Sequence, residues 1–273
     1  RMIDQYFNRF RYKLGEMKNP QEYVEKYGEA YEFVLKDEVH RRYYEGNNRI
    51  IYRLLGTGEL YLYYGENFSY ETYIVEGDFK IYSIIQPEKF ALVHREFNVK
   101  GKLELRTIGI GGYLNVKHDI NLFQNASADD RGIGFTKSDQ LAYYASNLNH
   151  LESNTKSYSH YRGIVNDQSY IRLDGMINIS KNATQSESFL DQHIMLLQDS
   201  ANAFAFPALK IENNMVKASH SATISKLPEE MLFYLETRGI SRKESIGMLI
   251  GGFINKVMDV DEKTYDIISQ YIN

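Results

Sequence analysis

The sequence predicts a mainly β protein with helical segments at both ends. From about Ile50 to Ile224, apolar residues alternate over short runs that are bounded by Gly, Asn, Asp and Ser. The chain has 23 Tyr, 14 Phe and no Trp, and tyrosine suits half-buried strands because its ring packs while its hydroxyl stays in water. Helical spacing and capping signals gather near the ends, and 273 residues are enough to bury a large core.

The first predicted element is a helix that begins after Pro20 and ends near Gly46. One face of this helix collects apolar residues at spacings of three and four, namely Tyr23, Tyr27, Ala30 and Val34. We therefore assign residues 1–48 to an N-terminal helical region.

Residues 49–225 are predicted to form the β core. Alternating pairs mark its strands, such as Tyr61 and Tyr63, Leu103 and Leu105, Ile171 and Leu173, Ile177 and Ile179, and Phe204 and Phe206. Turn-forming clusters separate them at residues 109–112, 125–131, 178–182 and 213–214. Ser138 could begin a helix that runs to Ala145, although the same residues also fit a strand. Alternation alone leaves a sandwich, a barrel and a parallel β-solenoid open, because no repeat of fixed length is visible.

Residues 226–273 are predicted to form three helices. Pro228 suits the first position of one helix and Gly239 its left-handed end, while Ser241 and Glu244 form a capping box for the second and Asp261 can cap the third. The second helix carries a continuous apolar stripe made of Ile246, Leu249, Ile250, Phe253, Ile254 and Val257. A helix with such a stripe must pack against something.

Composition excludes several classes of function. A net charge of -4 and a pI near 6.0 provide no basic field for nucleic acid. No apolar run reaches the roughly 18 residues of a membrane span. The absence of Cys rules out a disulfide or a thiolate metal site within this chain and fits the reducing cytoplasm, which is the expected location. The glycines at 109, 111 and 112 lack the Lys of a phosphate-binding loop, so we expect no ATPase activity.

Few polar groups suggest chemistry. The seven histidines are scattered, without the spacings of a zinc site. Asp129, Asp130 and Arg131 fit either the acid–base residues of a carbohydrate-cleaving solenoid or a solvated turn, and the turn is favoured. His220 lies among small side chains at residues 217–223, and taken by itself it is best explained as an ordinary hydrogen-bonded histidine.

Three motifs near the end of the chain share one order and spacing. They are Ser219-His220-Ser221-Ala222-Thr223, then Leu232-Phe233-Tyr234-Leu235 with Arg238-Gly239-Ile240, and finally Gly252-Phe253. In this arrangement they resemble the C-terminal signature of the SufB/SufD family, the scaffold subunits of the SUF iron–sulfur cluster assembly machine. The resemblance is specific over roughly residues 155–258.

The resemblance implies a right-handed parallel β-helix over residues 49–225, flanked by helical regions. It also implies a non-catalytic, SufD-like scaffold that pairs with a SufB-type subunit or with a second copy of itself. The C-terminal helices would contact the SufC-type ABC ATPase through Leu232, Phe233, Tyr234, Arg238, Gly239 and Phe253. A carbohydrate-active β-solenoid and a plain homodimeric structural protein are the alternatives.

The chain departs from the family at its metal-binding positions. Ala201 stands where SufB-type proteins carry a cysteine, and Ala218 where SufD-type proteins tend to carry one. Ser219 and Ser221 replace the acidic residues that flank the histidine in SufB-type proteins. His220 is then the one candidate metal ligand, shared with a partner chain that would supply the other ligands of an iron ion or iron–sulfur cluster at the subunit interface. No cofactor is expected to bind this chain alone.

Overall fold

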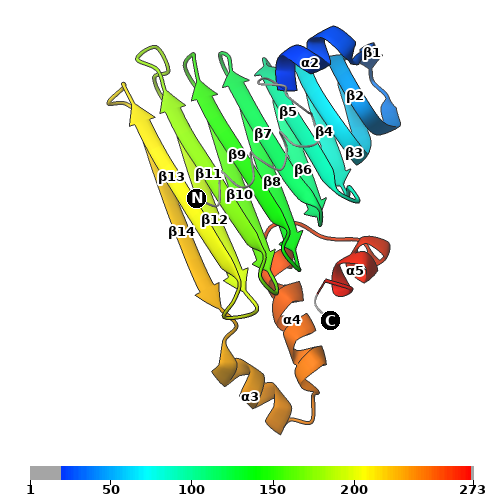
Figure 1. Ribbon diagram of the computed structural model, residues 1–273. Helices are drawn as coiled ribbons and strands as arrows, with labels where there is room; N and C mark the ends of the chain where they lie inside the picture. Colours follow the sequence, from blue (N-terminus) through cyan, green and yellow to red (C-terminus); the bar gives the residue numbers. More distant parts are fainter. Residues whose placement is uncertain (1–19, 272–273) are drawn as a thin grey trace.

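The computed structural model describes residues 20–271 and shows a parallel β-helix with helices at both ends (Figure 1). The helices are α2 (Pro20–Tyr27), α3 (Glu229–Thr237), α4 (Arg242–Asn255) and α5 (Glu262–Ser269). The strands are β1 (Glu29–Lys36), β2 (Val39–Leu55), β3 (Thr57–Val75), β4 (Asp78–Ile85), β5 (Phe90–Val99), β6 (Lys102–Ile110), β7 (Tyr113–Leu122), β8 (Ser127–Thr136), β9 (Leu141–His150), β10 (Lys156–Val165), β11 (Tyr170–Ile179), β12 (Glu187–Leu196), β13 (Asn202–Ile211) and β14 (Lys217–Lys226).

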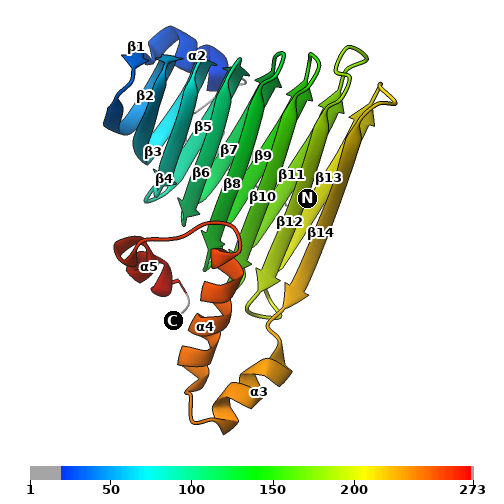
Figure 2. The same ribbon diagram turned by 180° about the vertical axis from the view of Figure 1, so that it is seen from behind.

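The strands form two facing layers, which Figures 1 and 2 show from opposite sides. One layer holds the odd-numbered strands β5 to β13 and the other the even-numbered strands β4 to β14, and every recorded pairing is parallel. The long strand β3 joins the layers, because residues 57–64 pair with β4 and residues 67–75 pair with β5. Each later coil adds one strand to each layer. The parallel β-helix that the family resemblance implied is confirmed.

Strand alternation creates the core between the layers. In β11, for example, buried and half-buried residues alternate over the whole strand, and the inward residues include Ile171, Leu173 and Ile177. In parallel strands equivalent positions lie directly above one another, so each inward residue contacts inward residues of the neighbouring coils. The result is one continuous apolar core along the β-helix.

A chain of buried charged groups interrupts this core. The Arg95 guanidinium donates to His118 Nε2 at 2.7 Å and to Ser83 at 2.6 Å. His118 Nδ1 lies 3.3 Å from an oxygen of Asp130, which also accepts the Tyr161 hydroxyl at 2.7 Å. Burial and the Arg95 charge lower the pKa of His118, so the ring is neutral and bridges the cation to the carboxylate.

The C-terminal helices fold back over the outer face of the even-numbered layer. Ile250 and Ile254 of α4 and Ile268 of α5 are buried against Ile133 and Phe135 of β8 and other apolar residues of this face. The capping box of Ser241 with Glu244 is present, and Asp261 accepts the backbone N–H of Thr264 at 2.6 Å. These helix starts are as predicted. None of the described helices combines the length and the apolarity needed to cross a bilayer.

The predicted N-terminal helical region is wrong over residues 29–48. The helix ends at Tyr27, and strands β1 and the first part of β2 follow it. Tyr31, Phe33 and Leu35 alternate towards the core, whereas Val34, which we placed on a helix face, is exposed. Two-residue alternation of aromatic and branched residues favours a strand and prevails here. Residues 1–19 lie outside the described part of the chain.

The structure settles one open expectation and corrects another. Of the helix and the strand that were both open for Leu141, Ala142 and Ala145, the strand is present as β9. The turn expected over residues 125–131 is shorter, because β8 begins at Ser127 and carries Asp129 and Asp130.

Candidate functional site

The last coil leaves the β-helix open at one end. Within residues 20–271, β13 pairs only with β11 and β14 only with β12, so each has one unpaired edge. Several inward-facing residues of this coil are small, such as Ala203, Ala205 and Ala218, and they only partly cover the core. The coil also exposes large apolar side chains on both faces: Phe204 and Phe206 face outward, whereas Leu209, Ile211 and Ile224 are in register with buried core residues and face the interior side. Open edges with exposed apolar groups are typical of a surface that another chain covers.

His220 lies on this open coil. It is in register with Leu190 of β12, which is buried in the core, so His220 faces the interior side of β14. No further coil covers it, and its side chain is exposed. The adjacent Ser219 and Ser221 are in register with Phe189 and Asp191 and therefore face outward.

Ala201 and Ala218, which stand where the family resemblance implied cysteine ligands, offer no ligands here. Ala201 is buried at the start of the last coil. Ala218 packs on the core two residues before His220, on the same face of β14. No cluster of three or more His, Asp or Glu side chains within residues 20–271 is arranged to hold a metal ion. His220 can therefore supply one ligand to a shared site but cannot form a site with its described neighbours.

A second candidate surface lies on the two helices that follow β14. Leu232 of α3 is completely buried, so it stabilises the contact between α3 and α4 and offers no surface to a partner. Phe233 and Tyr234 are 69% and 51% exposed. The Arg238 guanidinium lies 5.0 Å from the centre of the Tyr234 ring, and Gly239 ends the helix with φ of 85°.

The exposed apolar side chains of this helical pair are Met231, Phe233, Tyr234 and Met248, and we call them the α3–α4 surface. Figure 1 shows α3 beyond the ends of the strands, where the β-helix cannot cover it. Aromatic residues and methionine are enriched at protein interfaces because they supply contact area and adapt their shape.

Phe253 and the apolar stripe of α4 lie against the protein's own β-helix. Phe253 is half-buried and its ring lies 4.8 Å from the Arg162 guanidinium of β10. Ile250 and Ile254 are buried against the same layer. The buried residues of the stripe are therefore covered by the protein's own β-helix, whereas α3 and Met248 of α4 remain exposed.

The structure also joins residues that looked scattered in the sequence. His160 Nδ1 lies 3.1 Å from an oxygen of Asp191, and His193 Nε2 lies 3.7 Å from the same oxygen. Burial would raise the pKa of Asp191, but the hydrogen bond and the charge of His160 hold that pKa below its ordinary value. His160 and Asp191 are register partners on β10 and β12, a relation that only the coil length could have revealed.

The structure separates the two carboxylates on which the carbohydrate-cleaving alternative depends. Asp130 is buried inside the β-helix, whereas Asp129 lies on the outer face beside Arg106 and Arg131. Neighbouring residues of a strand point to opposite faces. The two carboxylates therefore cannot act together on one glycosidic bond.

Comparison with known proteins places this arrangement among assembly proteins. Residues 82–253 match the family model of the SufBD core domain of the SUF system for iron–sulfur cluster assembly. An iron–sulfur cluster assembly SufBD family protein of Synechocystis sp. is 28% identical over 163 residues, which are 59% of this chain and 34% of that protein.

Two further relatives carry the same description. The SufBD family protein ycf24 of Galdieria sulphuraria is 30% identical over 133 residues, which are 49% of this chain and 60% of that protein. The SufBD family protein of Staphylococcus epidermidis is 25% identical over 176 residues, which are 64% of this chain and 37% of that protein. The chain thus covers between about a third and three fifths of these relatives.

Proposed function

Because the chain belongs to the SufBD family of iron–sulfur cluster assembly proteins, we propose that it is a SufD-like scaffold subunit that binds a SufC-type ABC ATPase and pairs with a SufB-type subunit. It carries out no catalysis itself and works in the cytoplasm. ATP-driven closure of two ATPase subunits moves the paired scaffolds and opens their interface to iron and sulfur.

The observation that carries this proposal is the α3–α4 surface. Its aromatic and methionine side chains are exposed although the helices below them are anchored by buried Leu232 and Ile250. Exposed apolar side chains on helices that are already fixed by buried residues favour binding, because little conformational entropy is lost when the partner docks. Phe233 and Tyr234 are adjacent on α3 and would lie at the centre of the contact.

Co-purification with the cognate ATPase tests this surface. An affinity tag on the ATPase should retain the wild-type chain, and Phe233→Ser should weaken the complex by about 2 kcal/mol, or roughly thirtyfold in Kd. Val34→Ser is the matched control, because Val34 is about as exposed but lies on β1. A wild-type chain that fails to co-purify, or equal retention of both variants, would overturn this part of the proposal.

Pairing with a second scaffold is supported by the open coil. The unpaired edges of β13 and β14 present backbone N–H and C=O groups, and Phe206 and Ile224 beside them are exposed. A second subunit that added strands to these edges would satisfy the backbone groups and cover the apolar side chains. The interior face of the coil, with His220, would then lie at the junction.

Light scattering with the SufB-type partner tests the pairing. We expect a complex with the wild-type chain and a loss of pairing with Ile224→Lys, because the lysine would bring a charge into an apolar contact. Met215→Lys changes a residue of the neighbouring turn that is 64% exposed, compared with 46% for Ile224, and should leave pairing intact. Pairing that survives Ile224→Lys would place the interface elsewhere.

A further inference from the structure

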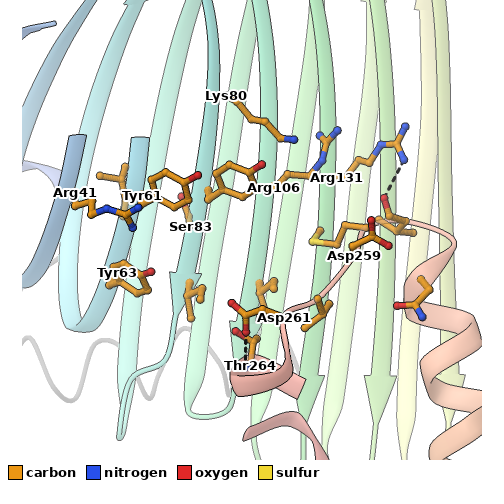
Figure 3. Close-up of a pocket in the computed structure, with 18 of the residues that line it drawn as sticks. Arg41, Tyr61, Tyr63, Lys80, Ser83, Arg106, Arg131, Asp259, Asp261 and Thr264 are labelled. Carbon is orange, nitrogen blue, oxygen red and sulfur yellow. Dashed lines mark hydrogen bonds between the residues drawn. The ribbon is translucent and has the colours of Figure 1, made fainter. Parts of the chain in front are cut away.

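A groove on the outer face of the even-numbered layer is separate from both surfaces described above. It has a volume of about 670 Å³ and lies between β2, β3, β4, β6 and β8 on one side and the segment that joins α4 to α5 on the other. Figure 3 shows side chains from these strands pointing into the same space as Asp259, Asp261 and Thr264. Five basic but only two acidic side chains line it.

Strand register places the basic residues in one row. Arg41 is the register partner of Tyr61, which is the partner of Tyr82, and the row continues through Arg106 to Arg131. Neighbouring strands lie about 4.8 Å apart, so Arg41 and Arg106 begin about 14 Å from each other. Lys80 extends from β4 into the same groove, between the two arginines in strand order (Figure 3).

Two of these cations are supported by aromatic rings. The Arg41 guanidinium lies 4.2 Å from the centre of the Tyr61 ring, and Lys80 Nζ lies 4.9 Å from the centre of the Tyr82 ring. The two rings are stacked on each other with centres 4.9 Å apart. When the flat face of a guanidinium lies over an aromatic ring, its N–H groups point sideways and stay free to bind an anion. Within the described residues, neither Arg41 nor Lys80 has an ion pair.

Arg106 and Arg131 share one carboxylate in direct contact, that of Asp129. Arg131 Nε donates to Asp129 at 2.8 Å, and Arg106 lies 3.4 Å from the same carboxylate oxygen. Arg131 also donates to the carbonyl oxygen of Val257 at 2.9 Å, which fixes the opposite wall of the groove. Glu104 also acts on Arg131, and Glu59 and Glu104 are the register partners of Lys80, so carboxylates flank the row. The excess of positive charge is that of the side chains that line the groove itself.

We propose that this groove binds a small ligand with a chain of linked phosphates. A single phosphate could contact only one end of a row about 14 Å long, whereas an oligophosphate can contact Arg41, Lys80 and Arg106 together. The ring faces of Tyr61 and Tyr82 are already occupied, so the tyrosines support the cations and leave no face free to stack on a base.

Calorimetric titration with inorganic tripolyphosphate, in low salt without Mg²⁺, tests this site. The wild-type chain should bind one equivalent, and Arg41→Gln and Lys80→Gln should each weaken binding about tenfold, because each removes a charge-assisted hydrogen-bond donor. Asp259→Asn should strengthen binding, since it removes a negative charge from the opposite wall. Lys100→Gln, in an exposed turn outside the groove, is the control and should bind like the wild type.

Two comparisons identify the source of the ligand. ATP that binds more tightly than tripolyphosphate would point to a nucleotide, and equal affinities would point to an inorganic polyphosphate; either result supports the site. Absence of saturable binding, or equal affinity of Lys80→Gln and Lys100→Gln, would overturn it. Arg41 is exposed, so loss of binding in Arg41→Gln with unchanged circular dichroism cannot arise from misfolding.

Discussion

Replacing Asp130 with Asn should destabilise the protein by about 1 to 3 kcal/mol, because it removes the buried acceptor that His118, Tyr161 and Ser146 share. Arg95 keeps a second buried carboxylate, its register partner Glu71 on β3. Asp130 is completely buried and Arg95 is 2% exposed. His118 connects them, since its Nε2 accepts from Arg95 and its Nδ1 faces the carboxylate. The pKa of Asp130 would be raised by burial, yet hydrogen bonds from His118 and from the hydroxyls keep it below its ordinary value, so the carboxyl is ionised.

The magnitude follows from these contacts. The carboxylate accepts the hydroxyls of Tyr161 and Ser146 at 2.7 and 2.5 Å in addition to its contact with His118. An amide keeps one acceptor oxygen, but its NH₂ group has to face a hydroxyl or the imidazole, and it carries no charge. Leaving a buried polar group unsatisfied costs about 1 to 3 kcal/mol, and the loss stays within this range because Glu71 still compensates the charge of Arg95.

Urea unfolding at pH 7 measures this effect. Asp119→Asn is the matched control, because Asp119 contacts Lys117 at 3.5 Å on the exposed outer face, where an ion pair contributes at most about 1 kcal/mol. The Arg95→Met, Asp130→Asn double variant should lose less than the sum of the two single variants. A change below about 1 kcal/mol for Asp130→Asn would refute the interpretation of the network as a compensated charge chain.

Three further predictions concern single side chains. Burial lowers the pKa of His150 to about 4, so below about pH 6.5 the unfolded chain binds a proton at this histidine that the folded chain does not, and the free energy of unfolding decreases. In urea unfolding, the wild type should therefore lose about 2 to 3 kcal/mol more than His150→Gln between pH 7 and pH 4.5. Equal losses in the two proteins would contradict this. The buried Tyr144 hydroxyl has no hydrogen-bond partner among the described residues, so Tyr144→Phe should leave the melting temperature unchanged or raise it, and a clear decrease would reveal a missed partner. His220→Ala should slow cluster assembly while α3 still binds the ATPase, and undiminished assembly would leave His220 without a role.

The helical C-terminus was predictable from local chemistry. The reciprocal hydrogen bonds of Ser241 and Glu244 and the cap by Asp261 are satisfied within one helical turn, so the residues themselves contain the signal. What the helices cover was not predictable, because the stripe of Ile250 and Ile254 fits a partner's surface as well as the protein's own sheet.

The alternation of apolar and polar residues was not enough to predict a β-helix rather than a sandwich or a barrel. A ladder of asparagines crosses the odd-numbered layer, with Asn121 donating to Asn98, Asn149 to Asn121 and Asn178 to Asn149. The members are 23, 28 and 29 residues apart, so the coils differ in length and produce no fixed repeat. Only the family resemblance supplied the right architecture.

Unequal coil lengths also explain why the sequence did not predict which side chains meet on neighbouring coils. Parallel register brings together His160 and Asp191, and likewise Arg41 and Tyr61, which no local motif connects. The hypothesis that Asp129 and Asp130 act together as acid and base is wrong for the opposite reason. The two residues are adjacent in sequence, but strand alternation places their side chains on opposite faces of β8.

Reconstituted cluster assembly tests the central claim most directly. The chain, its SufB-type partner and the cognate ATPase would be mixed with iron, a sulfide source and ATP, and cluster transfer to an apo-ferredoxin would be followed by visible absorbance. We predict that transfer depends on the chain, falls with Phe233→Ser and is unchanged with Val34→Ser. Transfer that proceeds equally well without the chain would contradict its role as a scaffold.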